Sequence, residues 1–415
     1  MTQTNQQNVP ELRFPGFSEK YQRTTLNECE PIVHGDGNWI LSENISDDGR
    51  YQVVQLGNIG LGEYVSKDLK RISQMDFEKV RGTLLEKGDL LINRMVDHSV
   101  YCCIFDKSGD FITSVDVCWI RKCSDFSNHY LMYQLVSPNA QKKLLSISSG
   151  SGRVRISKNN LFSELSIFLP PLPEQRKISS FFSAVDTKIA QLSEKGRLLE
   201  EYKRGCMQQL FSKITRFKGD NKNDFPDWEE KRLEEVAMRI RQKNNSLLIR
   251  DVLTNSAVHG IISQGDYFDH DVANAENLDR YTIVQTGDFV YNPRISATAP
   301  VGPIKRNKLK VGVMSPLYDV FRFHKDENLD FWEQYFNTTQ WYKYMKQVAN
   351  YGARHDRMAI SSNDFIAMPL PYLHPDEQKK IADFLMAIDK KISLVNQELE
   401  LAQSFKKGLL QQMFV

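Results

Sequence analysis

One helix-like stretch occurs twice in this chain, as PEQRKISSFFSAVDTKIAQL at residues 173–192 and as PDEQKKIADFLMAIDKKISLV at residues 375–395. When Glu174 is paired with Glu377, the two copies stay in register without a gap as far as Phe211 and Phe414. A register kept over that length indicates an internal repeat, which decides how the rest of the chain is interpreted. The 415 residues are therefore predicted to form two tandem units, each a globular part followed by a long helix.

The apolar residues of both copies follow the alternating spacing of four and three residues that is typical of a coiled-coil seam. They are Ile178, Phe182, Val185, Ile189 and Leu192 in the first copy and Ile381, Leu385, Ile388, Ile392 and Val395 in the second. A helix of this length spans about 57 Å, which is more than one small domain can cover. We therefore expect the two helices to pair with each other in antiparallel orientation.

Both seams are interrupted at the same step, by Lys203 in the first copy and by Lys406 in the second. The residue before each lysine is aromatic, Tyr202 in one copy and Phe405 in the other. We expect these two rings to fill the seam at the step where lysine cannot. The shared interruption predicts a local departure from ideal coiled-coil packing in both helices.

The globular parts contain short apolar runs between turn residues, together with helical segments, a pattern typical of the α+β fold class. A polar segment, FKGDNKNDFPDW at residues 217–228, marks the boundary between the two units. We predict a first globular domain at residues 1–168 and a first long helix at 169–216. A second globular domain is predicted at 217–369 and a second long helix at 370–415.

Composition limits the class of protein. Apolar residues make up 41% and charged residues 26%, and the net charge is only +2, so any surface for nucleic acid must be local. The six cysteines lack C-x-x-C spacing, and no stretch is long and apolar enough for a membrane span. The polar N-terminal segment predicts no signal peptide. We expect a cytoplasmic protein with reduced thiols.

Two pairs of matched segments carry side chains suited to DNA. One pair follows a predicted strand and contains Asn and Arg, and the other precedes each long helix and combines Gly with Arg. Arg can read guanine, Asn can read adenine, and cations bind phosphates. Together with a third basic run, the candidate DNA-binding residues are Asn93, Arg94, Arg153, Arg155, Asn292, Arg294, Lys305, Arg306, Lys308, Arg354 and Arg357. The alternative for each segment is a solvated loop without a ligand.

Enzyme motifs are incomplete in this chain. Tyr291-Asn292-Pro293-Arg294 has half of the N/D-P-P-Y/F loop of adenine methyltransferases but lacks the second proline and the aromatic residue. No G-x-x-x-x-G-K-[ST] segment occurs, and the histidines show no zinc spacing. We predict no catalytic residue, metal site or cofactor site in this chain.

Further matched motifs are the helix openings LPPLPEQRKI and LPYLHPDEQKKI, the segments GDLLINR and GDFVYNPR, and the helix ends QQLF and QQMF. With this layout the chain resembles the specificity subunits of type I restriction-modification systems over essentially its whole length. The resemblance implies two pseudo-symmetric target recognition domains, each reading one half of a bipartite asymmetric DNA sequence. It also implies that two long antiparallel coiled-coil helices separate these domains and fix the spacing of the half-sites.

The same resemblance implies partners. Two methyltransferase (M) subunits dock on such a subunit for adenine N6 methylation, and two restriction (R) motor subunits join for ATP-dependent DNA cleavage. S-adenosylmethionine, ATP and Mg²⁺ are expected in those partner subunits. We predict that partners contact Glu174, Gln175, Gly205, Glu377, Gln378 and Gly408. The alternatives are a coiled-coil scaffold that binds proteins without reading DNA, and a self-sufficient methyltransferase or nuclease.

Overall fold

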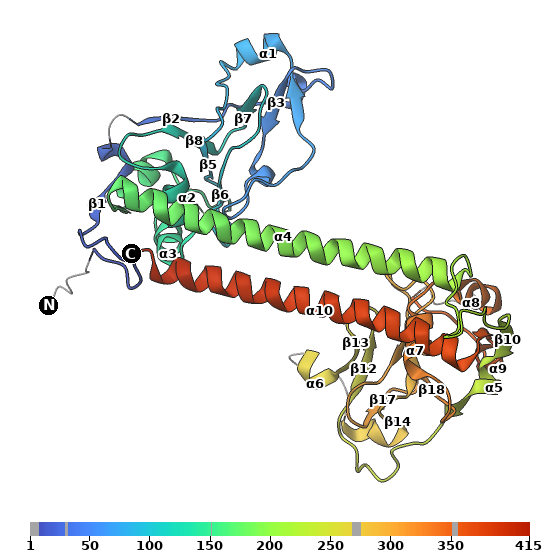
Figure 1. Cartoon of the computed structure of the whole chain (residues 1–415). Helices are drawn as coiled ribbons and strands as arrows, with labels where there is room; N and C mark the ends of the chain where they lie inside the picture. Colours follow the sequence, from blue (N-terminus) through green and yellow to red (C-terminus); the bar gives the residue numbers. More distant parts are fainter. Residues whose placement is uncertain (1–7, 30–31, 151, 268–274, 351–355) are drawn as a thin grey trace. The chain divides into compact units, whose positions relative to one another are not determined.

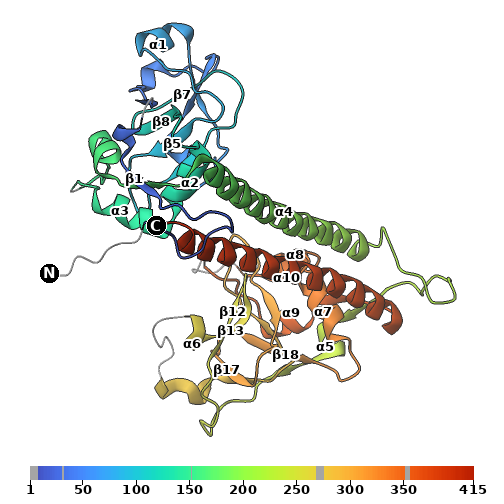
Figure 2. The same ribbon diagram turned by 60° about the vertical axis from the view of Figure 1, so that its left-hand side comes forward.

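A computed structural model of the chain describes residues 8–29, 32–150, 152–267, 275–350 and 356–415 (Figures 1 and 2). The chain divides into two compact units. Unit 1 comprises Met1–Glu194 and Asn396–Val415, and unit 2 comprises Lys195–Val395. Each unit therefore contains one globular domain and one part of each long helix.

Unit 1 is built on a four-stranded antiparallel sheet with the strand order β2-β8-β5-β6, beside a three-stranded sheet with the order β4-β3-β7. Its elements are β1 Gln22–Thr24, β2 Val33–Asp36, β3 Tyr51–Val54, β4 Lys70–Ile72, α1 Gln74–Lys79, β5 Leu90–Asn93, β6 Cys102–Ile104, β7 Phe111–Thr113, β8 Val117–Lys122, α2 Asn128–Val136, α3 Pro138–Ser146 and β9 Ile167–Leu169.

Strand β5 is buried on both faces because the four-stranded sheet lies between two apolar cores. Successive side chains of a strand point to opposite faces. Leu90 and Ile92 accordingly enter the core that contains α2 and the long helices, while Leu91 enters the core shared with the three-stranded sheet. The continuous apolar run in the sequence is explained by this burial on both faces.

Unit 2 repeats the four-stranded antiparallel sheet with the order β11-β18-β15-β16. Its elements are β10 Glu229–Arg232, α5 Leu233–Val236, β11 Ala237–Ile240, β12 Leu253–Ser256, β13 Gly260–Ser263, α6 Gln264–Tyr267, β14 Thr282–Val284, β15 Phe289–Tyr291, β16 Ile304–Arg306, β17 Gly312–Met314, β18 Asp319–Phe323, α7 Leu329–Phe336, α8 Tyr342–Val348, α9 Ser362–Ile366 and β19 Pro369–Tyr372. The mixture of helices and sheets in both units confirms the predicted α+β class.

The aromatic run of α7 and α8 belongs to the core of unit 2. Trp332, Tyr335, Phe336 and Trp341 are buried against the sheet, and Trp332 stacks on Phe323 of β18 with the ring centroids 4.9 Å apart. Rings held in this way contribute packing energy beyond their buried area. These aromatic residues are therefore unavailable for stacking on nucleic-acid bases.

The two long helices are α4, Leu172–Phe211, and α10, Pro375–Gln412. In unit 1 the beginning of α4 shares a core with the end of α10, through Phe182 and Met413 among others. In unit 2 the end of α4 shares a core with the beginning of α10, through Leu210 and Leu385. Each unit therefore packs the two helices in opposite directions, which confirms the predicted antiparallel pairing.

The interrupting lysines form ion pairs at matched positions in the two units. The Lys203 ammonium lies 2.7 Å from a carboxylate oxygen of Asp389, and that of Lys406 lies 2.6 Å from one of Asp186. The same two carboxylates accept hydrogen bonds from the globular domains, Asp389 from Gln334 of α7 and Asp186 from Tyr133 of α2. Each aspartate thus joins both long helices to the domain beside it.

The expectation that the aromatic rings fill the seam was wrong. Tyr202 and Phe405 are 56% and 57% exposed, although they adjoin the lysines. Neighbouring residues of a helix point about 100° apart. Because the lysines turn towards the opposite helix to reach their aspartates, the preceding rings turn towards solvent.

Candidate nucleic-acid interface

Two loops that are distant in sequence lie side by side in unit 1. The backbone N–H of Val96 donates to the carbonyl oxygen of Val154 at 2.9 Å, and that of Ile156 donates to the carbonyl of Arg94 at 2.8 Å. One loop follows β5, and the other belongs to the glycine- and arginine-rich segment before α4. We call these two segments, residues 94–97 and 153–156, the paired loops of unit 1.

Unit 2 contains the same arrangement. The backbone N–H of Ile295 donates to the carbonyl oxygen of Asp356 at 3.1 Å, and that of Met358 donates to the carbonyl oxygen of Pro293 at 2.9 Å. The paired loops of unit 2 are residues 293–296 and 356–358. The structure therefore brings together, in each unit, the two segments that sequence analysis selected separately.

Arg94 does not present its side chain to a ligand, contrary to our prediction. It is only 5% exposed, and its guanidinium lies 3.2 Å from Asp36 and 3.5 Å from Asp116. It also donates to the carbonyl oxygen of Ile156 at 3.2 Å. These contacts hold the end of β5, the turn before β8 and the second loop together, so Arg94 stabilises the paired loops from within.

The two asparagines of the candidate set are also buried, which corrects their predicted role in base readout. Asn93 accepts a hydrogen bond from the N–H of Met95 at 2.9 Å, and Asn292 accepts one from that of Arg294 at 3.0 Å. The Asn292 amide donates to the carbonyl of Asn255 at 2.9 Å. Such short-range bonds are typical of asparagine in turns. Both residues therefore shape the loop instead of contacting a base.

Arg294 occupies a different position from Arg94. When Asn93 is aligned with Asn292, the residue that corresponds to Arg294 is Met95. Both residues form a β-bridge to the second loop of their unit, Met95 to Arg155 and Arg294 to Arg357. Consecutive side chains of an extended segment point in opposite directions. The one-residue offset explains why Arg94 points inwards and Arg294 is exposed.

The second loop supplies the other exposed cations. Arg153 is exposed, and Arg155 is exposed with one nitrogen 3.5 Å from Asp116. Arg357 is partly exposed and lies 3.5 Å from Asp356. Arg354 lies outside the described residues. The cations that the paired loops offer are therefore Arg153 and Arg155 in unit 1 and Arg294 and Arg357 in unit 2.

The basic run on β16 faces α7 instead of a ligand. Lys305 donates to Asn337 at 2.7 Å, and burial lowers the pKa of its ammonium group. Arg306 lies 2.6 Å from Asp330, and Lys308 lies 2.7 Å from Glu333. The carboxylates of α7 thus offset this run, and the structure gives no support for its predicted DNA contact.

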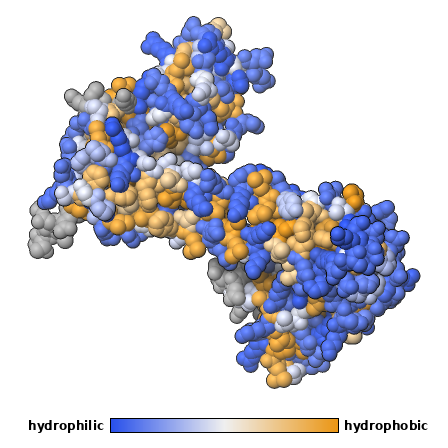
Figure 3. Space-filling model, viewed as in Figure 1, coloured by the Kyte–Doolittle hydropathy of each residue, from blue (hydrophilic) through white to orange (hydrophobic). Residues whose placement is uncertain are grey.

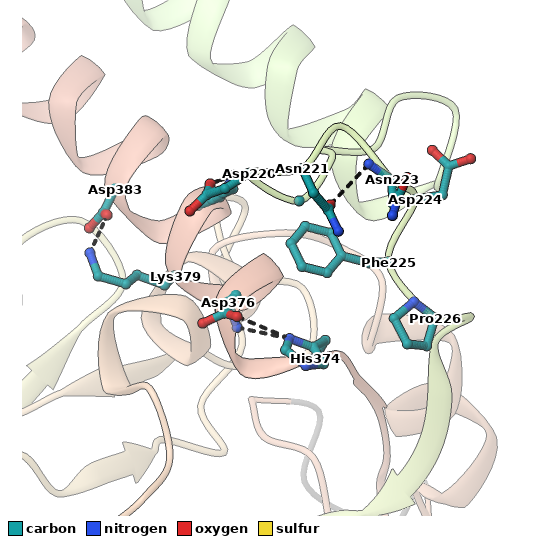
Figure 4. Close-up of a pocket in the computed structure, with 12 residues that line it drawn as sticks. Asp220, Asn221, Asn223, Asp224, Phe225, Pro226, His374, Asp376, Lys379 and Asp383 are labelled. Carbon is teal, nitrogen blue, oxygen red and sulfur yellow. Dashed lines mark hydrogen bonds and ion pairs between the residues drawn. The ribbon is translucent and has the colours of Figure 1, made fainter.

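A hollow of about 800 Å³ lies between the linker and the start of α10 (Figure 4). Its charged side chains pair with one another: Lys380 lies 2.6 Å from Asp220, and Lys379 lies 2.5 Å from Asp383. Phe225 stacks on His374 with the ring centroids 5.5 Å apart. The Lys380–Asp220 ion pair and the ring stack tie the linker to the start of α10, whereas the Lys379–Asp383 pair lies within that helix. Among the described residues, no group of three or more His, Cys, Asp or Glu side chains is placed to hold a metal ion.

Five of the six cysteines are buried, and Cys206 is partly exposed. All six are free of disulfides, and burial raises the pKa of the Cys103 thiol to about 12. Thiols react as thiolates, so burial of this kind makes them inert. Within the described residues, no helix combines the length and the apolar character of a membrane span.

Residues 19–201 match the family model of the type I restriction modification DNA specificity domain. The chain is similar to the specificity subunits of type I restriction-modification systems. It is 26% identical over 305 residues, 68% of each chain, to the type I restriction enzyme MjaVIII specificity subunit of Methanocaldococcus jannaschii. It is 24% identical over 400 residues to the putative MjaX specificity subunit of the same organism, covering 93% of this chain and 91% of the relative.

The fold is similar to that of a solved specificity subunit. The crystal structure of the type I restriction-modification S subunit from M. genitalium gives a TM-score of 0.57 at 13% sequence identity. The similarity covers 98% of this chain and 99% of that one. At this identity the likeness describes the fold and not the side chains that read a sequence.

The helix-opening motif of this chain has an internal role. Glu174 and Glu377 are fully buried. Arg13 holds Glu174 through two hydrogen bonds of 2.7 Å, and Arg216 holds Glu377 through bonds of 2.8 and 3.0 Å. Arg13 precedes β1 and Arg216 precedes β10, so each buried carboxylate attaches the segment before the first strand of a unit to the start of a long helix.

The neighbouring glutamines are buried as well. Gln175 donates to the carbonyl of Pro170 at 2.9 Å, and Gln378 donates to that of Leu373 at 3.1 Å. These bonds satisfy carbonyl groups of the turn before each helix. Our prediction that Glu174, Gln175, Glu377 and Gln378 contact a partner is therefore not supported, because their side chains are inaccessible and already bonded within the subunit.

The predicted glycines lie on open helix surface. A Cβ atom added at Gly205 or Gly408 would meet nothing within 4 Å. The sequence did not predict that the apolar residues beside them are exposed, since Tyr202 and Phe405 were expected to fill the seam. We call Leu198, Tyr202 and Gly205 the helix patch of unit 2, and Leu401, Phe405 and Gly408 the helix patch of unit 1. These apolar residues occupy matching positions in the two copies of the repeat but lie outside the coiled-coil seam. That combination was the sequence signal for an exposed apolar patch.

Proposed function

We propose that each unit of this specificity subunit reads one half of a bipartite, asymmetric DNA target through its paired loops. One observation carries the proposal: in both units the same two segments are hydrogen-bonded to each other and expose arginine side chains. The side chains around these arginines differ between the two units. Arginine suits both guanine edges and phosphates. Two units with the same backbone arrangement but different exposed side chains are suited to reading two different half-sites.

The antiparallel helices then act as the spacer between half-sites. Because each base pair adds 3.4 Å and rotates the next contact along the groove, two readers need a fixed separation. Asp186 and Asp389 each join both helices to the globular domain of their own unit, as such a spacer requires.

Partners complete the proposed function. We infer that one M subunit docks at each helix patch, since the patches are apolar, matched and repeated, and that R subunits join for ATP-dependent cleavage. Adenine N6 methylation would then be carried out by the M subunits, with S-adenosylmethionine, ATP and Mg²⁺ bound by partners and no catalytic residue supplied by this chain.

Methylation mapping tests the function directly. Genomic DNA from the source cell would be sequenced for N6-methyladenine before and after deletion of this gene. One bipartite motif should lose its methyl mark while other marks persist. Persistence of every bipartite mark would favour the coiled-coil scaffold without DNA readout.

Replacing Arg294 with alanine should weaken binding to one half-site. Loss of a base or phosphate contact in this position costs about 1–3 kcal/mol, or roughly five- to 150-fold in affinity. The measurement is fluorescence anisotropy with duplexes in which one or the other half-site is scrambled. Unchanged affinity for both half-sites would remove Arg294 from the interface.

Replacing both Leu401 and Phe405 with glutamate should release one M subunit from the complex. Two charges on the apolar docking face should weaken that contact on the order of 100-fold. Native mass spectrometry of the co-expressed subunits would report the loss as a complex with one M copy. A matched control is glutamate at Leu394, which is exposed on the same helix but outside the patch. Retention of both copies by the double variant would exclude the patch.

A further inference from the structure

The loop that follows β11 ends in an exposed apolar tip. Leu248 is 83% exposed, more than any other large apolar side chain in the described part of the chain, and its neighbour Leu247 is also exposed. In Figure 1 this loop is the lower tip of unit 2, and Figure 3 shows apolar surface there. Single exposed leucines are common in proteins, but two adjacent ones on a projecting turn need an explanation.

The tip is held in shape by a fully buried asparagine. The Asn244 side chain donates to the backbone carbonyl of Ile249 at 2.7 Å and accepts a hydrogen bond from the backbone N–H of Ile249 at 3.3 Å. These two bonds close the loop. The Leu247 N–H donates to the carbonyl of Asn244 at 2.8 Å. Leu247 has a φ of +54°, a conformation that is costly for a leucine and is kept only where surrounding contacts enforce it. The two leucines are therefore presented by a constructed turn.

Cations flank the tip on both sides in sequence. Arg241 and Lys243 precede it and Arg250 follows it, and all three are exposed. Lys243 donates to the hydroxyl of Thr282 at 3.0 Å, whereas Arg241 and Arg250 have no partner among the residues that the structure describes. A narrow apolar tip between cations is complementary to a groove bordered by phosphates.

Unit 1 carries a corresponding feature. β2 and β11 are the edge strands at the same end of the strand order in their four-stranded sheets. The loop after β2 exposes Trp39, at 72%, and Leu41. Large apolar side chains thus project from the same topological position in both units, although the residues differ.

We propose that the Leu247–Leu248 tip enters a groove of the DNA and contacts bases of the half-site read by unit 2, while Arg241 and Arg250 contact the flanking phosphates. Apolar side chains recognise thymine methyl groups or wedge between base steps, and both contacts depend on sequence. This inference rests on the proposed function, because it requires that unit 2 reads DNA.

The test uses the full chain and the duplex identified by methylation mapping. Affinities would be measured by anisotropy over a range of salt concentrations for L247A/L248A, for R241Q/R250Q and for the control I214A. Ile214 is an exposed apolar residue outside the globular domain. A second duplex has the half-site of unit 2 scrambled, and a third has the half-site of unit 1 scrambled.

L247A/L248A should bind the intact target about tenfold more weakly, with an unchanged salt slope and unchanged affinity for the duplex that lacks the half-site of unit 2. R241Q/R250Q should bind all duplexes more weakly, with a salt slope smaller by about two. I214A should match the wild type, and retained binding of L247A/L248A to the half-site of unit 1 shows that it is folded.

Equal affinity of L247A/L248A and wild type for the intact target, or an equal loss on all duplexes, would overturn the inference. Loss of an M subunit without a change in DNA affinity would assign the tip to a protein partner and would also overturn it. If the wild type itself shows no preference for the target, the proposed function fails instead.

Discussion

Replacing Arg216 with alanine should destabilise unit 2 by about 3–5 kcal/mol, because it leaves a buried carboxylate without its countercharge. Glu377 has no exposed surface and receives two hydrogen bonds from Arg216 and one of 3.0 Å from the indole of Trp228. The indole alone cannot balance the charge. The remaining carboxylate must then be protonated or hydrated inside the fold, and both processes cost free energy.

Urea denaturation followed by circular dichroism would measure this loss. The matched control is alanine at Lys380, whose ion pair with Asp220 is as short, at 2.6 Å, but involves a carboxylate that is 97% exposed. Exposed pairs contribute about 0–1 kcal/mol, so the control should stay close to the wild type. A similar loss of unfolding free energy in the two variants would contradict the conclusion that the buried Arg216–Glu377 ion pair stabilises unit 2.

Replacing Arg94 with alanine should destabilise unit 1 by about 2–3 kcal/mol, since Asp36 and Asp116 would lose the cation between them. The expected loss is smaller than for Arg216 because Asp36 is partly exposed and can be hydrated. The second loop should also loosen, as Arg94 donates to the carbonyl of Ile156. Thermal unfolding and hydrogen exchange of the paired loops would show both effects.

The contrast with Arg294 makes this prediction specific. Alanine at Arg294 should change stability by no more than about 0.5 kcal/mol, because the side chain is exposed. Its effect should appear in DNA affinity instead. A stable R94A variant that selectively loses one half-site would restore Arg94 to the interface and would contradict the role that burial gives it.

The difference between Arg94 and Arg294 shows where sequence reasoning stops. The motifs GDLLINR and GDFVYNPR each end in one of the paired loops, and the structure joins each to the second segment that was selected from the sequence. Residue type then suggested that the two arginines match. The strand register matches Arg294 with Met95, and in an extended chain that single position separates an inward from an outward side chain.

The glutamates of the helix openings illustrate a second limit. They were predicted to contact partners, but the structure shows that the same internal ion pair is built twice, with Arg13 in unit 1 and with Arg216 in unit 2. A repeated fold repeats its internal bonds as faithfully as its binding sites. Sequence alone cannot separate the two, because burial depends on chain segments more than 150 positions away.

The sequence by itself determined the α+β class and the antiparallel pairing of the long helices. Each of these follows from periodicity and repetition, which are properties of neighbouring residues along the chain. Tertiary structure alone decided which charges face inwards. Lys203 pairs with Asp389, and Arg94 pairs with Asp36, only after folding brings distant segments together. Such ion pairs determine which cations remain exposed and available to a ligand such as DNA.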